Sequence, residues 1–258
     1  MGEPLRIHTE DAARWITLDR PEVRNALDVA TGDALAAALI EAATDHDVHA
    51  IVLTGTDPAF SAGGDLDRFD ETDHTAFRFA SHELTQVIGL AERIEKPVVA
   101  AINGVTTGAG AQLALACDVR IASHRARLLW REGYLGLLPS HGGIARLVQL
   151  IGLGRARDLV LGGYELDAAD AHRFGLVSEV VAHDVLHDRV RARLALIARR
   201  SPDAYAVTKR VLGAVGGLPL ATGQAIETLG QSLLVGTDEF ADRLERARER
   251  RSGGAEQA

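Results

Sequence analysis

Short apolar runs separated by helical patterns constrain the fold of this chain most strongly. Ala50-Ile-Val-Leu-Thr54 and Pro97-Val-Val-Ala-Ala-Ile102 predict buried strands, and Asp118-Val-Arg-Ile-Ala122 predicts a further strand. The alternating segment Arg14-Trp-Ile-Thr-Leu18 predicts a strand that ends at Arg20-Pro21. Because continuous apolar strands are typical of a sheet covered on both faces, we expect an α/β core with parallel strands.

Apolar residues at helical spacing occupy the segments between these runs. They predict helices over residues 27–43 and 76–94, and a short helix near 109–116. From about residue 143 helical patterns dominate, with one strand-like piece at Leu176–Val181. The alternation of strand and helix therefore belongs to the first part of the chain.

The length of 258 residues, 47% of them hydrophobic, fits one large domain or a domain with a helical appendage. Ser201-Pro202 marks the change between the two parts. We expect an α/β core over residues 1–200 and a C-terminal helical region over residues 201–258.

Charge and cysteine content narrow the class of protein. There are 28 Lys+Arg against 36 Asp+Glu, a net charge of −8, so nucleic-acid binding through phosphate neutralisation is not expected. Cys117 is the only cysteine and is expected in the core, and no Cys/His spacing is typical of a zinc site. No leader and no apolar run of about 18 residues is visible, so a cytoplasmic protein without a membrane span is expected.

Three glycine-bearing segments follow predicted strands. They are Phe60-Ser-Ala-Gly-Gly-Asp-Leu66, Asn103-Gly-Val-Thr-Thr-Gly-Ala-Gly-Ala-Gln112 and Trp130-Arg-Glu-Gly-Tyr-Leu-Gly-Leu-Leu-Pro-Ser-His-Gly-Gly143. Glycine lets the backbone approach a ligand, and ligands favour the carboxyl ends of strands in α/β folds. The spacing differs from the dinucleotide fingerprint, the phosphate-binding loop and the nucleophile elbow. Taken singly, each segment also fits an ordinary tight turn.

Together and in this order, the three segments resemble the enoyl-CoA hydratase/isomerase (crotonase) superfamily. The resemblance extends to Arg20-Pro-Glu-Val-Arg-Asn-Ala-Leu27, Ile51-Val-Leu-Thr-Gly55 and Gly162…Asp167-Ala…Ala171…Gly175-Leu-Val177. It implies a crotonase-like spiral of ββα units with a C-terminal helical trimerisation region. It also implies an acyl-CoA thioester substrate and a homotrimer or homohexamer. Coenzyme A enters with the substrate, so no separate cofactor and no metal is expected.

The resemblance assigns an oxyanion hole to the backbone N–H groups of Gly64 and Ala109. Such donors stabilise the charge of a thioester enolate and are worth about 3 kcal/mol each in other oxyanion holes. Ala109 lies at the predicted start of a short helix, where N–H groups are unpaired and the dipole favours an anion. Relatives more often carry glycine here, and the alanine methyl group narrows the thioester slot. We expect the two N–H groups to converge on a point about 3 Å from each.

The resemblance assigns the catalytic positions to Gln112 and Glu132, where typical hydratases carry two glutamates. Gln112 forms hydrogen bonds but exchanges no proton near neutral pH, whereas Glu132 can act as base and then as acid, especially in a dry pocket. One carboxylate suffices to move a proton between two carbons and serves the addition of water less well. The alternatives are a solvent-facing carboxylate at Glu132 and a structural amide at Gln112.

Further substrate contacts are assigned within the first and third segments. Ala62 and Asp65 are expected beside the substrate, with Asp65 orienting its loop rather than reacting. Trp130 and Tyr134 flank Glu132 and either line the acyl pocket or fill the core.

Ser140 and His141 replace the small residues that are common in this loop of the family. His141 is either an additional acid, base or polar substrate contact, or a structural residue. Asp70-Glu-Thr-Asp-His74 leads into the predicted helix 76–94 and is either a mobile wall of the pocket or a solvated loop.

The phosphates of coenzyme A require cations, and the resemblance points to Arg24 and Lys209. Both also fit plain solvated surface charges. Phe240–Arg251 departs from the family, because relatives often end in an aromatic- and lysine-bearing segment that covers the adenine. Here the segment is rich in charge and is expected to form a solvated helix.

The leading hypothesis is an enzyme that acts on an acyl-CoA through an enolate with Glu132 as proton carrier. Isomerisation of an enoyl-CoA double bond is favoured over hydration. The alternatives are a decarboxylating enzyme or one that forms a carbon–carbon bond. The sequence Phe60-Ser-Ala-Gly-Gly-Asp65 is similar to the corresponding loop of carboxymethylproline synthases, which form a carbon–carbon bond. A non-catalytic acyl-CoA binder is a further alternative, against which the retention of Glu132 argues.

Overall fold

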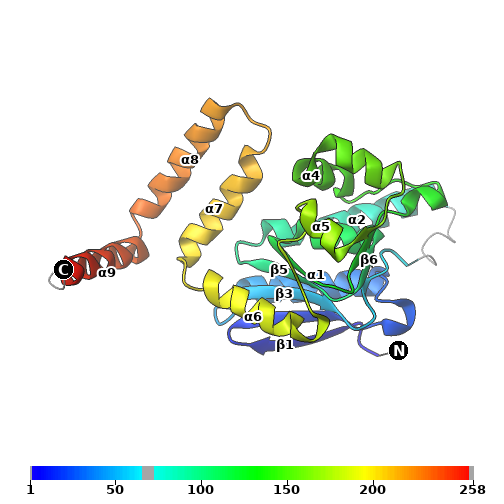
Figure 1. Ribbon diagram of the computed structural model, residues 1–258, viewed down its shortest axis with the longest axis horizontal. Coiled ribbons are helices and arrows are strands. Elements are labelled where there is room, and N and C mark those ends of the chain that lie inside the picture. The colour runs from blue at the N-terminus through cyan, green and yellow to red at the C-terminus, as the bar shows by residue number, and fades with distance from the viewer. Residues whose placement is uncertain (1, 66–72, 256–258) are drawn as a thin grey trace. The chain divides into compact units, whose positions relative to one another are not determined.

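The computed structural model describes residues 2–65 and 73–255. The chain forms two compact units, Met1–Ile197 and Ala198–Ala258. Figure 1 shows that the first unit contains the strands, whereas the second unit consists of helices.

Two sheets make up the α/β unit. The larger sheet has the order β1-β2-β3-β5-β7-β10, in which β1 and β2 are antiparallel and the other neighbours are parallel. Its strands are β1 Leu5–Glu10, β2 Ala13–Leu18, β3 Ala50–Gly55, β5 Val98–Ile102, β7 Val119–Ser123 and β10 Glu179–Val181. The smaller sheet has the order β4-β6-β8-β9, with β4, β6 and β8 parallel and β9 antiparallel to β8. Its strands are β4 Ala59–Ser61, β6 Val105–Thr107, β8 Arg127–Leu129 and β9 Leu166–Asp167.

Helices follow the strands in a repeating order. The sequence strand, strand, helix occurs as β3-β4-α2, β5-β6-α3 and β7-β8-α4, which is the predicted series of ββα units. The helices of the first unit are α1 Val29–Thr44, α2 His74–Arg93, α3 Gly108–Ala116, α4 Gly143–Val160, α5 Ala168–Arg173 and α6 Leu186–Ile197. Each ββα unit thus places its first strand in the larger sheet and its second in the smaller one.

The predicted strands and helices are confirmed within a few residues, and the differences have local causes. The helix predicted from residue 27 begins at Val29, because the carboxylate of Asp28 accepts the N–H of Thr31 and caps the first turn. The strand-like piece 176–181 is a strand only over Glu179–Val181. Strand β1 and the whole smaller sheet were not predicted.

The strands β2, β3, β5 and β7 of the larger sheet are buried on both faces, as their apolar sequences predict. In β3, Ile51 and Leu53 belong to the main core with α1, α2 and α3, whereas Ala50 and Val52 belong to a second core with α6. Cys117 lies in the main core, which confirms its predicted place.

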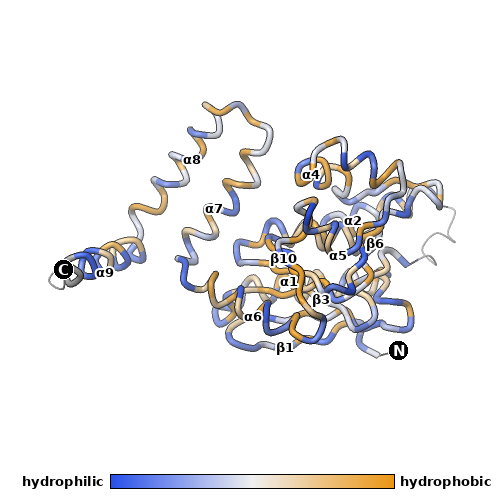
Figure 2. Tube along the Cα trace, in the orientation of Figure 1, coloured by the Kyte–Doolittle hydropathy of each residue, from blue (hydrophilic) through white to orange (hydrophobic). Residues whose placement is uncertain are grey.

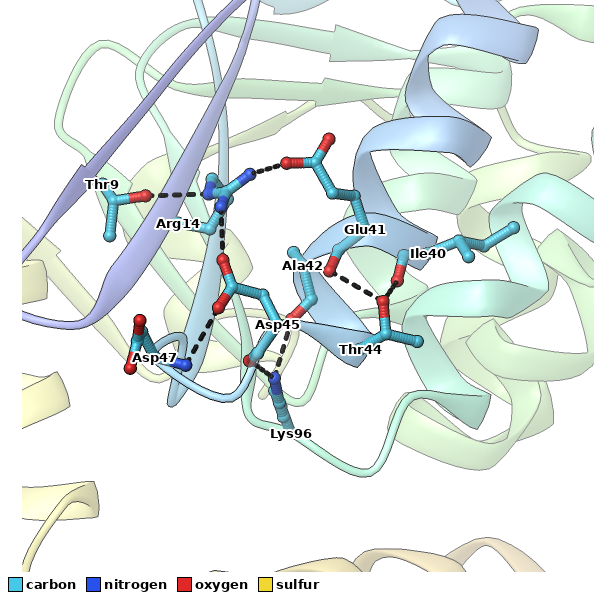
Figure 3. Close-up of polar contacts among 9 residues, drawn as sticks. All are labelled: Thr9, Arg14, Ile40, Glu41, Ala42, Thr44, Asp45, Asp47 and Lys96. Carbon is cyan, nitrogen blue, oxygen red and sulfur yellow. Dashed lines mark hydrogen bonds and ion pairs between the residues drawn. The ribbon is translucent and has the colours of Figure 1, made fainter.

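A buried guanidinium ties the N-terminal hairpin to the end of α1 (Figure 3). Arg14 on β2 donates to Thr9 at 2.8 Å and forms ion pairs with Glu41 at 2.8 Å and Asp45 at 2.9 Å. Lys96 donates to the carbonyl oxygens of Ala42 and Asp45 at the carboxyl end of the helix. Cations there are favoured by the helix dipole and bind the carbonyls that the helix leaves unpaired.

Arg14→Met is expected to lower the free energy of unfolding by about 2 kcal/mol, because the stem is kept while hydrogen bonds to charged partners are lost. For a unit of this size the melting temperature should fall by about 4–8 °C. Arg6→Met is the matched control, since Arg6 pairs with Asp19 but its side chain is 62% exposed. Thermal denaturation that affects both variants equally would contradict the structural role of the Arg14 network.

The second unit contains α7 Pro202–Val215, α8 Leu220–Val235 and α9 Asp238–Ala255. Ser201 caps α7 by accepting the N–H of Ala204, and Pro202 occupies the first helical turn, where its missing N–H has no cost. Figure 2 shows α9 as mainly hydrophilic, and its side chains from Ala241 to Arg251 are exposed except at Leu244. The predicted charged helix at the C-terminal end is therefore confirmed.

No helix in residues 2–65 and 73–255 combines the length and the apolar character that a membrane span requires.

Candidate active site

The three glycine-bearing loops leave the carboxyl ends of three neighbouring parallel strands. These strands are β4, β6 and β8 of the smaller sheet, and not the longer apolar strands that the sequence predicts before the loops. Carboxyl ends of parallel strands meet at one edge of a sheet, where ligands of α/β proteins bind. The smaller sheet therefore brings the three loops to one place.

Glycine makes the contact between the first two loops possible. Gly63 has φ +94°, and a Cβ atom at this residue would lie 2.8 Å from the oxygen of Thr107 and 3.1 Å from the nitrogen of Ala109. Any side chain there would collide with the second loop. The backbone of the first loop thus packs directly against the start of α3.

The predicted oxyanion donors lie on these two touching loops. Two backbone hydrogen bonds join Leu27 to the first loop: the N–H of Leu27 donates to the oxygen of Gly63 at 2.7 Å, and the N–H of Asp65 donates to the oxygen of Leu27 at 3.1 Å. Neither of them uses the N–H of Gly64. Ala109 is the second residue of α3, in the turn whose N–H groups have no partner within the helix. Convergence of the two N–H groups on one point stays a prediction.

Gln112 and Glu132 form a hydrogen-bonded pair. Gln112 lies on α3 and is 1% exposed, and Glu132 begins the 3₁₀ turn Glu132–Leu135 after β8. The Nε2 atom of Gln112 donates to Oε1 of Glu132 at 2.9 Å. Only the amide nitrogen can donate to a carboxylate, so this contact fixes the orientation of the amide.

Burial raises the pKa of Glu132, because removal from water disfavours the ionised form. Hydrogen bonds from its own backbone N–H and from Gln112 act in the opposite direction and are weaker. Among the described residues, the buried atoms Oε2 of Glu132 and Oε1 of Gln112 have no hydrogen-bond partner. The pair therefore offers a proton-accepting oxygen and a second acceptor beside it.

The other predicted residues of the first loop lie around its backbone. The N–H of Ala62 donates to the oxygen of Arg24 at 2.8 Å, and the Arg24 side chain is exposed. Asp65 pairs with Arg20 at 3.4 Å, a contact that orients the loop. Lys209 lies on α7 in the other unit.

The residues of the third loop divide into buried and exposed ones. Trp130 is 4% exposed, whereas Tyr134 is 80% exposed. Ser140 is exposed and its carbonyl accepts the N–H of Gly143 at 2.8 Å. His141 contacts Thr85 of α2 through its ring. Residues 70–72 of the predicted pocket wall lie outside the described residues, and Asp73 caps α2.

Sequence reasoning missed three polar residues that surround the third loop. Thr85 and Glu92 lie on α2, and Arg146 lies on α4. Their contacts join positions 54 to 56 residues apart and follow no motif. The one signal in the sequence is Thr85, a polar residue that follows the buried Leu84 in the predicted helix 76–94.

The two sheets and the three loops at one sheet edge define the crotonase fold, and the comparisons with known proteins agree. The chain belongs to the enoyl-CoA hydratase/isomerase family, whose model matches residues 8–252. It is thus an enzyme of the lyase or isomerase kind, and the predicted family and fold are confirmed.

Relatives resemble the chain over almost its whole length. A protein of Rhizobium meliloti (strain 1021) named "Probable enoyl-CoA hydratase" is 37% identical, with 92% of each chain covered. The 2,3-dehydroadipyl-CoA hydratase of Escherichia coli (strain K12) is 34% identical, with 91% of each covered. The crystal structure of an enoyl-CoA hydratase from Bacillus anthracis is 30% identical, with a TM-score of 0.91 and 96% of each chain covered.

Proposed function

We propose that this chain isomerises an enoyl-CoA thioester, with Glu132 as the single group that moves the proton. The observation that carries the proposal is the Gln112–Glu132 pair, in which one half-buried carboxylate is held by an amide that exchanges no proton. Burial raises the pKa of Glu132 and brings it nearer to neutral pH, where one group serves as both base and acid.

In the proposed reaction the thioester oxygen lies at the N–H groups of Gly64 and Ala109. Glu132 takes a proton from C2 of a 3-enoyl thioester, and the electron pair of the C2–H bond forms the C1–C2 double bond of an enolate while the carbonyl pair moves onto the thioester oxygen. In the second step the C3–C4 pair takes the proton from Glu132 at C4, and the C1–C2 pair forms the C2–C3 double bond as the carbonyl group forms again. The enolate charge between the two steps rests on the thioester oxygen, which the backbone donors stabilise. The atoms balance with no further reactant.

Hydration of a 2-enoyl-CoA is the second candidate. Oε1 of Gln112 and Oε2 of Glu132 are buried acceptors without a partner among the described residues, so a water that donates to both would satisfy them. A lone pair of this water would attack C3 as Glu132 takes one water proton, and the electron pair of the C2–C3 double bond would move into the enolate. Glu132 would then pass the proton to C2. The names of relatives such as the 2,3-dehydroadipyl-CoA hydratase also favour this reaction.

Arg24 is the proposed contact for the coenzyme A phosphates within the first unit. Its backbone oxygen accepts the N–H of Ala62, which places it beside the first loop, and its side chain is exposed. Lys209 of α7 is the second proposed contact. Homotrimeric or homohexameric assembly through the helical region and a cytoplasmic location complete the proposal, which requires no cofactor besides the coenzyme A of the substrate.

The products formed from 3-enoyl-CoA and 2-enoyl-CoA in heavy water test the proposal. We expect a protein that elutes as a trimer or hexamer to convert the 3-enoyl to the 2-enoyl thioester, as separated by liquid chromatography. A 3-hydroxyacyl thioester as the main product of the 2-enoyl substrate would favour hydration instead. A monomer, or tight acyl-CoA binding without turnover, would contradict the proposal and favour a non-catalytic binder.

A further inference from the structure

The third loop ends in an unusual backbone conformation. His141 has φ 52° and Gly142 has φ 81°, both in the left-handed region, and α4 begins at the next residue. Residues other than glycine are uncommon there and persist where the surroundings hold them in place. The contacts of His141 therefore show what holds the end of this loop.

The carbonyl group of His141 is held by an arginine that is itself fixed. Nη1 of Arg146 donates to the oxygen of His141 at 2.6 Å. The Nε and Nη2 atoms of Arg146 donate to the two carboxylate oxygens of Glu92, both at 2.6 Å. A bidentate pair of this kind has a defined geometry, so the carbonyl of His141 is anchored to α2 through Arg146.

The ring of His141 is held by α2 as well. Its Nδ1 atom lies 2.8 Å from Oγ1 of Thr85, and the same hydroxyl donates its hydrogen to the oxygen of Ser81 at 2.9 Å. A hydroxyl has one hydrogen, so the Thr85 oxygen accepts and Nδ1 of His141 carries the donated hydrogen. Hydrogen counting thus makes Nδ1 of His141 the donor in this contact.

Both anchors of His141 come from one face of α2. Thr85 and Glu92 lie two helical turns apart, so their side chains leave the helix in the same direction. The helix therefore holds the ring through Thr85 and the main chain through Glu92 and Arg146.

The end of the third loop, at Gly143, packs against the side-chain amide of Gln112. A Cβ atom on Gly143 would lie 2.7 Å from Cγ and 3.0 Å from Nε2 of Gln112, so the two residues are in close contact. The same Nε2 atom donates to Glu132 at 2.9 Å. Gln112 thus occupies the space that a side chain on residue 143 would need and packs against the backbone of Gly143.

We propose that His141 is a positioning residue, whose hydrogen bond to Thr85 keeps Gly143 against Gln112 and so keeps the Gln112 amide on Glu132. The proposal rests on the function proposed above for Glu132. It develops the alternative that His141 is a structural residue of the third loop.

Thr85→Val and His141→Gly test the proposal, because each removes one partner of the bond. Valine keeps the shape and the helical preference of threonine, and glycine keeps the backbone conformation. We expect kcat to fall on the order of 10-fold with little change in KM, as for a lost hydrogen bond that orients the reacting group. Glu83→Gln is the control, since Glu83 is an exposed residue of the same helix.

His141→Asn is expected to restore most of the activity. Asparagine tolerates the left-handed region, and its Nδ2 atom is bonded to Cγ as Nδ1 of histidine is, so it can donate to Thr85. If His141 acted only through its imidazole ring, asparagine would not restore the activity.

The titration of Glu132, followed by carbon NMR of labelled glutamate, gives a readout that does not need turnover. Loss of the Gln112 hydrogen bond leaves only the backbone N–H of Glu132 to oppose the effect of burial, so the pKa of Glu132 should rise in Thr85→Val and His141→Gly. Wild-type kcat and titration in both variants would overturn the proposal, as would a loss of thermal stability alone. If no form isomerises or hydrates an enoyl-CoA, the proposed function fails while the titration still decides the role of His141.

Discussion

Glu132→Gln is expected to abolish turnover of enoyl-CoA while leaving its binding nearly unchanged. Glutamine keeps the size and the hydrogen-bonding capacity of glutamate, so the contact with Gln112 can be retained, but it takes up no proton near neutral pH. General acid–base steps are worth about 10²–10⁴ in rate, and the loss is larger where no other group can carry the proton. Steady-state kinetics and calorimetric titration with a non-reacting acyl-CoA measure the two effects separately.

The pH dependence gives an independent check of this assignment. Because burial raises the pKa of Glu132, kcat/KM of the wild type should increase as the pH rises through that pKa and the carboxylate forms. The residual kcat/KM of Glu132→Gln should lack this rise with pH. A variant that keeps the wild-type rate and pH profile would show that another group moves the proton.

The raised pKa of Glu132 also affects the stability of the fold. The resulting change of stability with pH is opposite in sign to that caused by an ion-paired carboxylate, whose pKa is lowered. In the unfolded chain the carboxyl group ionises near its ordinary pKa of 4.5, whereas in the folded protein it holds its proton to higher pH. The folded state therefore loses stability as the pH rises from that value through the raised pKa. Glu132→Gln should melt no lower than the wild type at neutral pH.

The main strands could be predicted because burial on both faces leaves a continuous apolar run. Strand β1 gave no such signal, since only Leu5 of its residues is buried. The strands of the smaller sheet are two or three residues long, too short for any periodicity to show. Yet these short strands carry the three loops, so the architecture of the site lay in the part of the fold that the pattern missed.

The sequence could point to Gln112 and Glu132 as the proposed catalytic pair, but it could not point to the residues that hold them in place. Gln112 and Glu132 lie in loops whose glycines and order resemble a family. The contact of Thr85 with His141 joins positions 56 residues apart, and Gly143 acts only through the space that its missing side chain leaves for Gln112. Such features follow from packing of helices against loops, and a single sequence does not encode them locally.

Gln112→Glu is the change expected to alter the reaction itself. It places a second carboxyl group where the amide now lies 2.9 Å from Glu132. Two carboxylates so close cannot both ionise near neutral pH, so the pair should share one proton and titrate in two separated steps. The protonated partner then supplies the acid and the ionised partner the base that addition of water to a 2-enoyl-CoA requires.

Hydration by Gln112→Glu should therefore rise, by up to about 10² if the new group contributes as other general acids do. Isomerisation should fall, because the shared proton lowers the fraction of ionised Glu132. Gln112→Leu is the control: it removes the hydrogen bonds without adding an acid, so it should slow isomerisation and leave hydration low. The ratio of 3-hydroxyacyl to isomerised thioester, measured by liquid chromatography for each variant, separates the two effects. Fast hydration by the wild type that Gln112→Glu does not increase would mean that the amide and Glu132 alone hold and activate the water.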